Sequence, residues 1–179
     1  VEYDLSQHRK VYPDNDWQFR LDPSEPCEVM NKVDGSLGIL YRYEDGMLAV
    51  ATRGSFTSEQ ALHATRVLHE RYEYFAPREG LTYLLEIVYP ENRVVVDYGG
   101  MDDLVLLDVI ETETGLQAMD YTWFDWPGPY VEVFSENTLA DALALSPRVN
   151  AEGVVVRFED GLMLKIKQEY QILHRQTGP

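Results

Sequence analysis

The chain has 179 residues, of which 45% are hydrophobic and 12% aromatic, and 31 acidic against 15 basic residues give it a net charge of −16. This length is enough for one domain with a sizeable core, and the composition excludes a disordered chain. The acidic balance argues against extensive wrapping of nucleic acid. It allows a local group of Lys and Arg around one phosphate, because distant charges are screened beyond about 8 Å.

The longest apolar runs are too short to cross a membrane, and no signal-peptide pattern is present. The single cysteine, Cys27, excludes an internal disulfide and a cysteine-rich metal site. We expect a cytoplasmic protein in which Cys27 is a small packing residue. The chain starts with Val1, and we expect residues 1–179 to be one domain, either a fragment or a minimal form without a C-terminal domain.

The first half of the chain is predicted to contain two hairpins separated by a helix. Alternating apolar residues around Asp45-Gly46 predict a hairpin over residues 36–52. Thr57, with Gln60 three residues later, resembles a capping box at the start of a helix. A polar turn between residues 81–89 and 94–98 predicts the other hairpin.

The second half adds strands over residues 103–110 and 130–134, and a short helix that Asn137 is expected to cap. A second Asp-Gly pair predicts a hairpin over residues 152–167, and a helix is expected at 168–175. Antiparallel strands therefore dominate, and the combination with few helices is of the α+β class.

The last hairpin gathers charge. A two-residue turn would pair Val156 with Lys165 and Val154 with Lys167, and Glu152 would lie on that same face. One carboxylate and two ammonium groups then share a surface. This surface is either an ordinary solvated strand face or an anion site beside a metal-binding carboxylate.

Three further charges stand beside apolar strands. Lys32 precedes a strand, where burial of an ammonium is costly unless an anion meets it. Arg53 is expected opposite Gly38 in the first hairpin, and Glu86 is the only charge in an apolar run, facing either solvent or a pocket. The sequence has no GxxxxGK[ST], GxGxxG, HExxH or GxSxG motif, which argues against the familiar nucleotide, zinc and serine hydrolase sites.

Six motifs in order resemble the nucleotidyltransferase motifs of covalent ligases, and in detail those of the phage-type RNA ligase family that repairs broken tRNA and of fungal-type tRNA ligases. The KxDG motif alone is shared with DNA ligases and mRNA capping enzymes, whereas the ordered set is far more specific. The resemblance runs from about Glu28 to Arg175. The motifs are KVDGS at Lys32, TRGS at Thr52, LEIVYPENRVVVDY from Leu85, LVLLDVIETETG from Leu104, EGVVVRF at Glu152 and KIKQEYQILHR from Lys165.

This resemblance implies antiparallel sheets that enclose a nucleotide pocket with flanking helices, as in nucleotidyltransferase or ATP-grasp-like ligase catalytic domains. It implies ATP and Mg²⁺ (or Mn²⁺) as cofactors, with Lys32 as the nucleophile that carries AMP. Asp34 and Gly35 would shape the loop and support the later sealing step, Arg53 would approach the phosphate or acceptor end, and Glu86 would hold the ribose hydroxyls.

In the same family pattern Glu152 would position the divalent metal, and Lys165 and Lys167 would contact the α-phosphate. Asn31 is a candidate contact near adenine. The family's arginine upstream of the nucleophile is not recognisable here: Arg9 and Arg20 are its candidate stand-ins, with a position before Val1 as the alternative. Neighbouring positive charge favours the neutral, nucleophilic form of a lysine, whose ordinary pKa is about 10.4.

The function implied is ATP-dependent RNA joining through a lysyl-AMP intermediate. Its partner would be an RNA with a 5′-phosphate and a 3′-hydroxyl, tRNA-like or nicked, with a further domain or an end-healing protein alongside. Two alternatives stay open: another polynucleotide ligase or a guanylyltransferase of the same superfamily, and a non-catalytic module that binds nucleotides or RNA ends.

Overall fold

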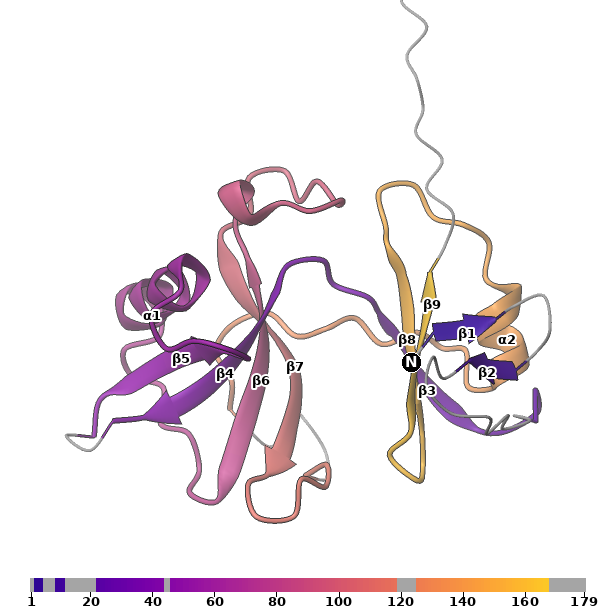
Figure 1. Ribbon diagram of the computed structural model, residues 1–179, viewed down its shortest axis with the longest axis horizontal. Helices are drawn as coiled ribbons and strands as arrows, with labels where there is room; N and C mark the ends of the chain where they lie inside the picture. The colour runs from indigo at the N-terminus through magenta and orange to yellow at the C-terminus, as the bar shows by residue number, and fades with distance from the viewer. Residues whose placement is uncertain (1, 5–8, 12–21, 44–45, 119–124, 168–179) are drawn as a thin grey trace, which may run out of the picture. The chain divides into compact units, whose positions relative to one another are not determined.

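The computed structural model describes residues 2–4, 9–11, 22–43, 46–118 and 125–167. The chain folds as two compact units, each built on one sheet (Figure 1). Unit 1 comprises residues 1–32 and 132–179, and unit 2 comprises residues 33–131. That the whole chain works as one nucleotidyltransferase domain stays a prediction.

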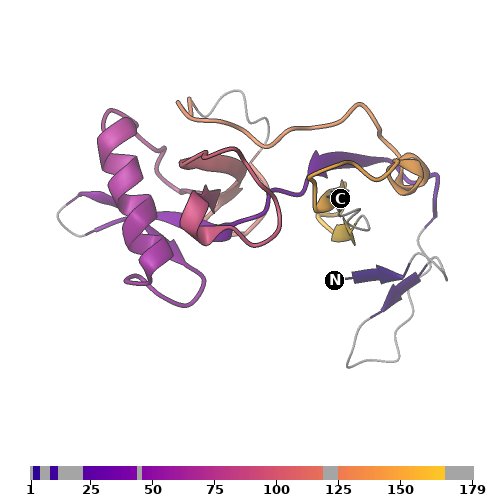
Figure 2. The same ribbon diagram turned by 90° about the horizontal axis from the view of Figure 1, so that it is seen from above.

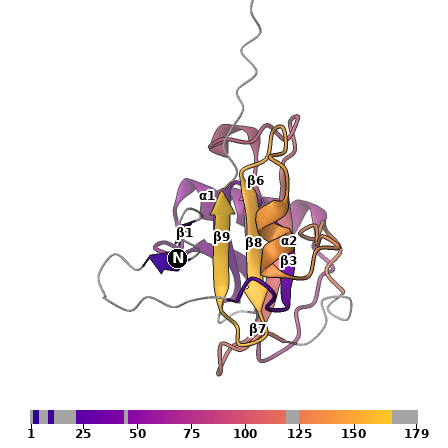
Figure 3. The ribbon, with the colours of Figure 1, turned by 90° about the vertical axis from the view of Figure 1, so that its right-hand side faces the viewer.

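Unit 1 holds a five-stranded sheet in the order β2-β1-β9-β8-β3, in which only the contact between β1 and β9 is parallel. The short helix α2 (Leu139–Ala144) packs against one face of this sheet (Figure 3). Alternate residues of β3, β8 and β9 point to α2 and form the core of the unit. The strands are β1 (Glu2–Asp4), β2 (Arg9–Val11), β3 (Cys27–Asn31), β8 (Gly153–Phe158) and β9 (Met163–Lys167).

Unit 2 holds a four-stranded antiparallel sheet in the order β5-β4-β6-β7. The helix α1 (Glu59–Arg71) lies along one face of this sheet (Figure 2), and its apolar stripe is buried there. The strands are β4 (Ser36–Arg42), β5 (Leu48–Thr52), β6 (Leu81–Val88) and β7 (Asp103–Glu111), and a 3₁₀ turn, η1 (Pro90–Asn92), follows β6. The α+β prediction, with mainly antiparallel strands and few helices, is confirmed.

Both helices start one residue later than predicted. Ser58, not Thr57, caps α1, because its side-chain oxygen accepts the N–H of Ala61 at 3.2 Å. Thr138 caps α2 in the place expected for Asn137. The helix expected at 168–175 and the candidate Arg20 lie outside the described residues, and of Arg9 the structure describes only the backbone in β2.

The two Asp-Gly hairpins exist, but their predicted registers are wrong by one residue. The N–H of Tyr43 donates to Met47 O at 2.8 Å, and that of Phe158 donates to Leu162 O at 2.9 Å, so three residues, not two, separate the bonded ends of each hairpin. The last loop residues, Gly46 and Gly161, have φ of 87° and 81°. Such loops end in a left-handed glycine and shift the pairing by one position.

The hairpin predicted over residues 81–98 is also wrong. β6 pairs with β4 and β7, and residues 94–98 form no strand. Residues 130–134 make only isolated bridges, from Tyr130 to Leu106 and from Val133 to Met30. In the part of the chain that the structure describes, no helix is long and apolar enough to span a membrane.

Candidate active site

Unit 1 brings Lys32, Gly153 and Lys167 into one row across three strands. The backbone N–H of Lys32 donates to Gly153 O at 3.0 Å, directly after β3. Gly153 is the first residue of β8 and pairs with Lys167, the last residue of β9. Lys32 and Lys167 therefore flank a residue without a side chain, on the face of the sheet opposite α2.

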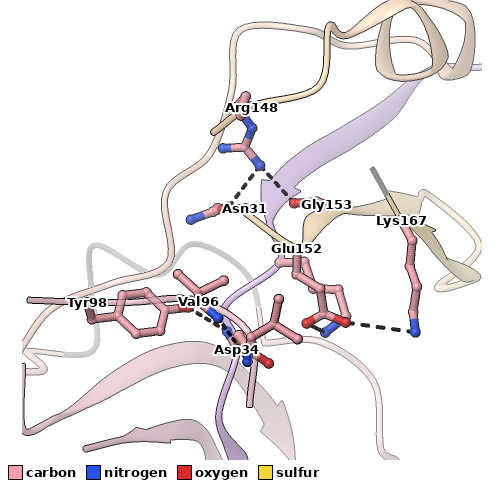
Figure 4. A network of polar contacts seen from close by, with 10 residues as sticks. Asn31, Asp34, Val96, Tyr98, Arg148, Glu152, Gly153 and Lys167 are labelled. Atoms are coloured by element: carbon pink, nitrogen blue, oxygen red, sulfur yellow. Dashed lines mark hydrogen bonds and ion pairs between the residues drawn. The ribbon is translucent and has the colours of Figure 1, made fainter. Parts of the chain in front are cut away.

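The carboxylate of Glu152 lies at this row. One of its oxygens accepts a hydrogen bond and ion pair from Lys32 Nζ, and the other lies 3.9 Å from Lys167 Nζ (Figure 4). The side chains of Lys32 and Glu152 are each only 15% exposed, whereas that of Lys167 is 60% exposed. A largely desolvated pair is stable only when its geometry is close and both charges are present.

Gly153 makes this arrangement possible. Its φ of 151° is one that residues with side chains rarely adopt, and a Cβ there would collide with the carbonyl oxygen of Ile166. Glu152 lies just before β8 and outside its regular alternation. It therefore meets Lys167 even though the predicted strand register is wrong.

The corrected register also changes the neighbours of the two lysines. Val154 and Val156 had been predicted on the same face as the two lysines. They lie instead on the α2 side, where both are fully buried. Gly153 faces Lys167, and Val155 faces Lys165. Lys165 and Lys167 are exposed on the same face of β9, since they alternate with buried Leu164 and Ile166.

Asn31 points to the opposite face from Lys32. Its backbone pairs with that of buried Val154, and its side-chain oxygen accepts a hydrogen bond from Arg148 Nη2 at 3.0 Å. An arginine can only donate, so this contact assigns the oxygen of the amide to Arg148.

In unit 2, Asp34 is 7% exposed, and its carboxylate accepts the N–H groups of Val95 at 2.6 Å and Val96 at 2.7 Å (Figure 4). Its own N–H donates to Tyr98 Oη at 2.6 Å. The next residue, Gly35, runs so close to β6 that a Cβ would lie 2.5 Å from Ile87 O. Asp34 thereby anchors the segment that had been expected to form a strand.

The other two predicted site residues of unit 2 are Glu86, which lies on the sheet, and Arg53, which lies in a turn beside it. Glu86 is half-buried on β6 between Leu37 on β4 and Val105 on β7. Gly38 faces Thr52, not Arg53 as predicted, and Arg53 is exposed in the turn after β5.

The sequence matches the family model described as RNA ligase, of the phage T4 type, over residues 11–171. The chain belongs to the RNA ligase family. A search of curated proteins found no significant match.

Solved structures of a Naegleria gruberi RNA ligase share the fold of this RNA ligase family member. A mutant with AMP and Mn superposes with a TM-score of 0.58 at 20% identity, covering 82% of this chain and 50% of that one. A mutant with ATP and Mn gives 0.58 at 18% identity, covering 92% and 52%. The complex with PPi gives 0.58 at 20%, covering 81% and 50%. The chain thus spans about half the length of these relatives.

The site offers one carboxylate, that of Glu152, as a ligand for a divalent cation. Within the described ranges, no three His, Cys, Asp or Glu side chains form a group that could hold a metal. Mg²⁺ is commonly bound by one or two carboxylates together with substrate phosphates and water. Glu152 offers one such carboxylate, so this RNA ligase family member fits a metal that arrives with a nucleotide.

Sequence reasoning missed Arg148 and Tyr98. Arg148 lies in an irregular segment between α2 and β8, where no periodicity predicts a contact. Tyr98 was assigned to a strand. Their importance follows from the hydrogen bonds that join Tyr98 to Asp34, and Arg148 to Asn31 and Gly153.

Proposed function

We propose that this chain is the adenylyltransferase domain of an ATP-dependent RNA ligase, with Lys32 as the residue that accepts AMP. The observation that carries the proposal is the ion pair of Lys32 with Glu152, beside Lys167. It combines a lysine nitrogen, a carboxylate suited to a cation and a second positive charge, which are the groups that phosphoryl-type transfer from ATP requires.

The first step proposed is attack by Lys32 Nζ on the α-phosphorus of ATP. A nitrogen–phosphorus bond forms, the bond from the α-phosphorus to the bridging oxygen breaks, and pyrophosphate leaves with the electron pair. The ammonium must lose a proton first, and its nitrogen must leave Glu152, to which it is hydrogen-bonded. The resting pair is therefore a state before reaction.

Mg²⁺ or Mn²⁺, when bound, would supply positive charge that stabilises the departing phosphates. Glu152 would hold that ion through the oxygens that now face Lys32 and Lys167. Lys165 and Lys167, exposed on one face of β9, would contact the α-phosphate.

The roles expected for the remaining residues are part of the same proposal. Asp34 and Gly35 would support the loop after the nucleophile, Glu86 would bind the ribose hydroxyls, and Arg53 would contact a phosphate or acceptor end. Asn31 would offer its amide near adenine. The joining steps would transfer AMP from Lys32 to an RNA 5′-phosphate. A 3′-hydroxyl would then attack that phosphate, so that a phosphodiester bond forms and AMP leaves.

Intact mass spectrometry tests the covalent step. After incubation with ATP and Mg²⁺ we expect one added AMP, absent in Lys32→Ala. The chain has only four lysines, Lys10, Lys32, Lys165 and Lys167, so peptide mapping distinguishes the site. No adduct with the wild-type chain would reject the proposal in favour of a binding module, and an adduct on another lysine would reject the assigned nucleophile.

The nucleotide and the polymer are tested separately. GTP in place of ATP should give no adduct on Lys32. A GMP adduct would indicate a guanylyltransferase instead. Nicked RNA and nicked DNA, supplied with the adenylylated protein, identify the acceptor: joining of DNA alone would indicate a DNA ligase.

A further inference from the structure

Arg148 joins the ends of the two strands that carry the candidate site. It lies half-buried in the segment between α2 and β8, and its Nη2 donates to Asn31 Oδ1 at 3.0 Å and to Gly153 O at 2.8 Å (Figure 4). Asn31 is the last residue of β3, and Gly153 is the first of β8. The next residue after β3 is Lys32, and the residue before β8 is Glu152.

The same carbonyl oxygen accepts both Arg148 and the backbone N–H of Lys32. Because Glu152 is bonded to Gly153, a shift of this carbonyl would move both partners of the ion pair. The guanidinium is held over the ring of Phe134, with its central carbon 4.7 Å from the ring centroid. A planar cation stacked on a ring and bonded on its edge has little freedom to move.

We propose that Arg148 is a positioning residue for lysine adenylylation. It fixes the ends of β3 and β8 at the separation that sets Lys32 against Glu152, without itself touching the nucleotide. This inference rests on the proposed function. Misplacing a reacting group by about 1 Å costs on the order of 100-fold in rate, so removing the bridge should slow the reaction without altering the residues that react.

The test is the single-turnover rate of adduct formation in the 179-residue chain, measured against ATP concentration. Arg148→Met keeps the apolar stem over Phe134 but loses both hydrogen bonds. We expect its maximal rate to fall about 10- to 100-fold, while the ATP concentration for half-maximal rate changes less than about threefold. Circular dichroism at the assay temperature establishes that the variant is folded.

Arg42→Met is the matched control, because Arg42 also donates to a glycine carbonyl, Gly46 O at 2.7 Å, but at the hairpin of unit 2. Its rate should equal that of wild type. Arg148→Lys keeps the charge but loses the flat stacking group, and it should react several-fold more slowly than wild type and faster than Arg148→Met. If Arg148→Met does not fold, the rate of Arg148→Lys tests the positioning role of Arg148.

A folded Arg148→Met or Arg148→Lys that reacts at the wild-type rate would overturn the inference and leave the proposed function intact. A raised ATP requirement with an unchanged maximal rate would also overturn it, because Arg148 would then act on the nucleotide. A wild-type chain that forms no adduct would remove both proposals together.

Discussion

Lys32 donates its backbone N–H to the carbonyl oxygen of Gly153 at 3.0 Å, although the two residues are 121 positions apart in the chain. This bond extends the β3–β8 ladder by one residue beyond the strand. It sets Lys32 and Gly153 opposite each other, so Glu152, the residue before Gly153, lies next to this pair. The side chains of Lys32 and Glu152 then form the ion pair on which the proposed chemistry depends.

Gly153→Ala should destabilise unit 1 and abolish the ion pair. Its φ of 151° is strained for a residue with a side chain, and the new Cβ would collide with Ile166 O. We expect a loss of about 2 to 4 kcal/mol in the free energy of unfolding, measured by urea denaturation. Gly161→Ala is the control: its φ is 81°, but its Cβ would meet nothing within 4 Å, and about 1 kcal/mol is expected. Equal losses would contradict the steric role of Ile166.

Asp34→Ala should release the segment after η1. Two backbone N–H groups, of Val95 and Val96, would lose a charged acceptor, at a cost of about 3 kcal/mol. Hydrogen exchange should show these two amides exchanging much faster in the variant. The exposed Asp97, which accepts the N–H of Gly99, provides the control: Asp97→Ala should cost less than about 1 kcal/mol. Unchanged protection of both amides would remove the anchoring role of Asp34.

Glu152→Gln should slow lysine adenylylation by about 100-fold or more and raise the Mg²⁺ concentration needed, because the amide carries no charge for a cation. Single-turnover rates over a Mg²⁺ series measure both effects. Glu28→Gln is the matched control. Glu28 lies on the same face of the sheet as Lys32, and its Oε2 accepts a hydrogen bond from Arg157 Nε at 3.1 Å. A wild-type rate and Mg²⁺ requirement in Glu152→Gln would exclude Glu152 as the metal residue.

Cys27 should react slowly with iodoacetamide at pH 8. Burial, together with the nearby carboxylates of Asp141 and Glu25, raises the pKa of this thiol to about 11. Since only the thiolate reacts, alkylation of the folded chain should be on the order of 100-fold slower than that of the urea-unfolded chain, whose thiol has a pKa of about 8.5. Equal rates in the two states would contradict the burial of Cys27.

The same raised pKa predicts how stability changes with pH. The folded state keeps the thiol protonated, whereas the unfolded chain ionises at lower pH. The contribution of Cys27 is therefore complete below about pH 8.5 and is lost as the pH rises toward about 11. Urea midpoints of wild type and Cys27→Ala, compared from pH 7 to 10.5, should show the larger decline in wild type. Parallel curves would contradict this linkage.

The sequence by itself determined local features: most of the segments that form strands, that the two Asp-Gly pairs mark hairpins, and that Lys32 precedes a strand within a KxDG motif. These are properties of neighbouring residues, so periodicity and turn chemistry are sufficient to read them. The α+β class and the family resemblance followed from the same local patterns.

Only the tertiary structure decided which strands pair and in what register. β6 pairs with β4 and β7 and has no partner in residues 94–98, because pairing depends on packing between distant segments. A one-residue shift moved Val154 and Val156 to the core face, while Glu152, lying outside the strand, still met Lys32. The bridge made by Arg148 was invisible for the same reason: its partners come from β3 and β8, and no local pattern records a contact between them.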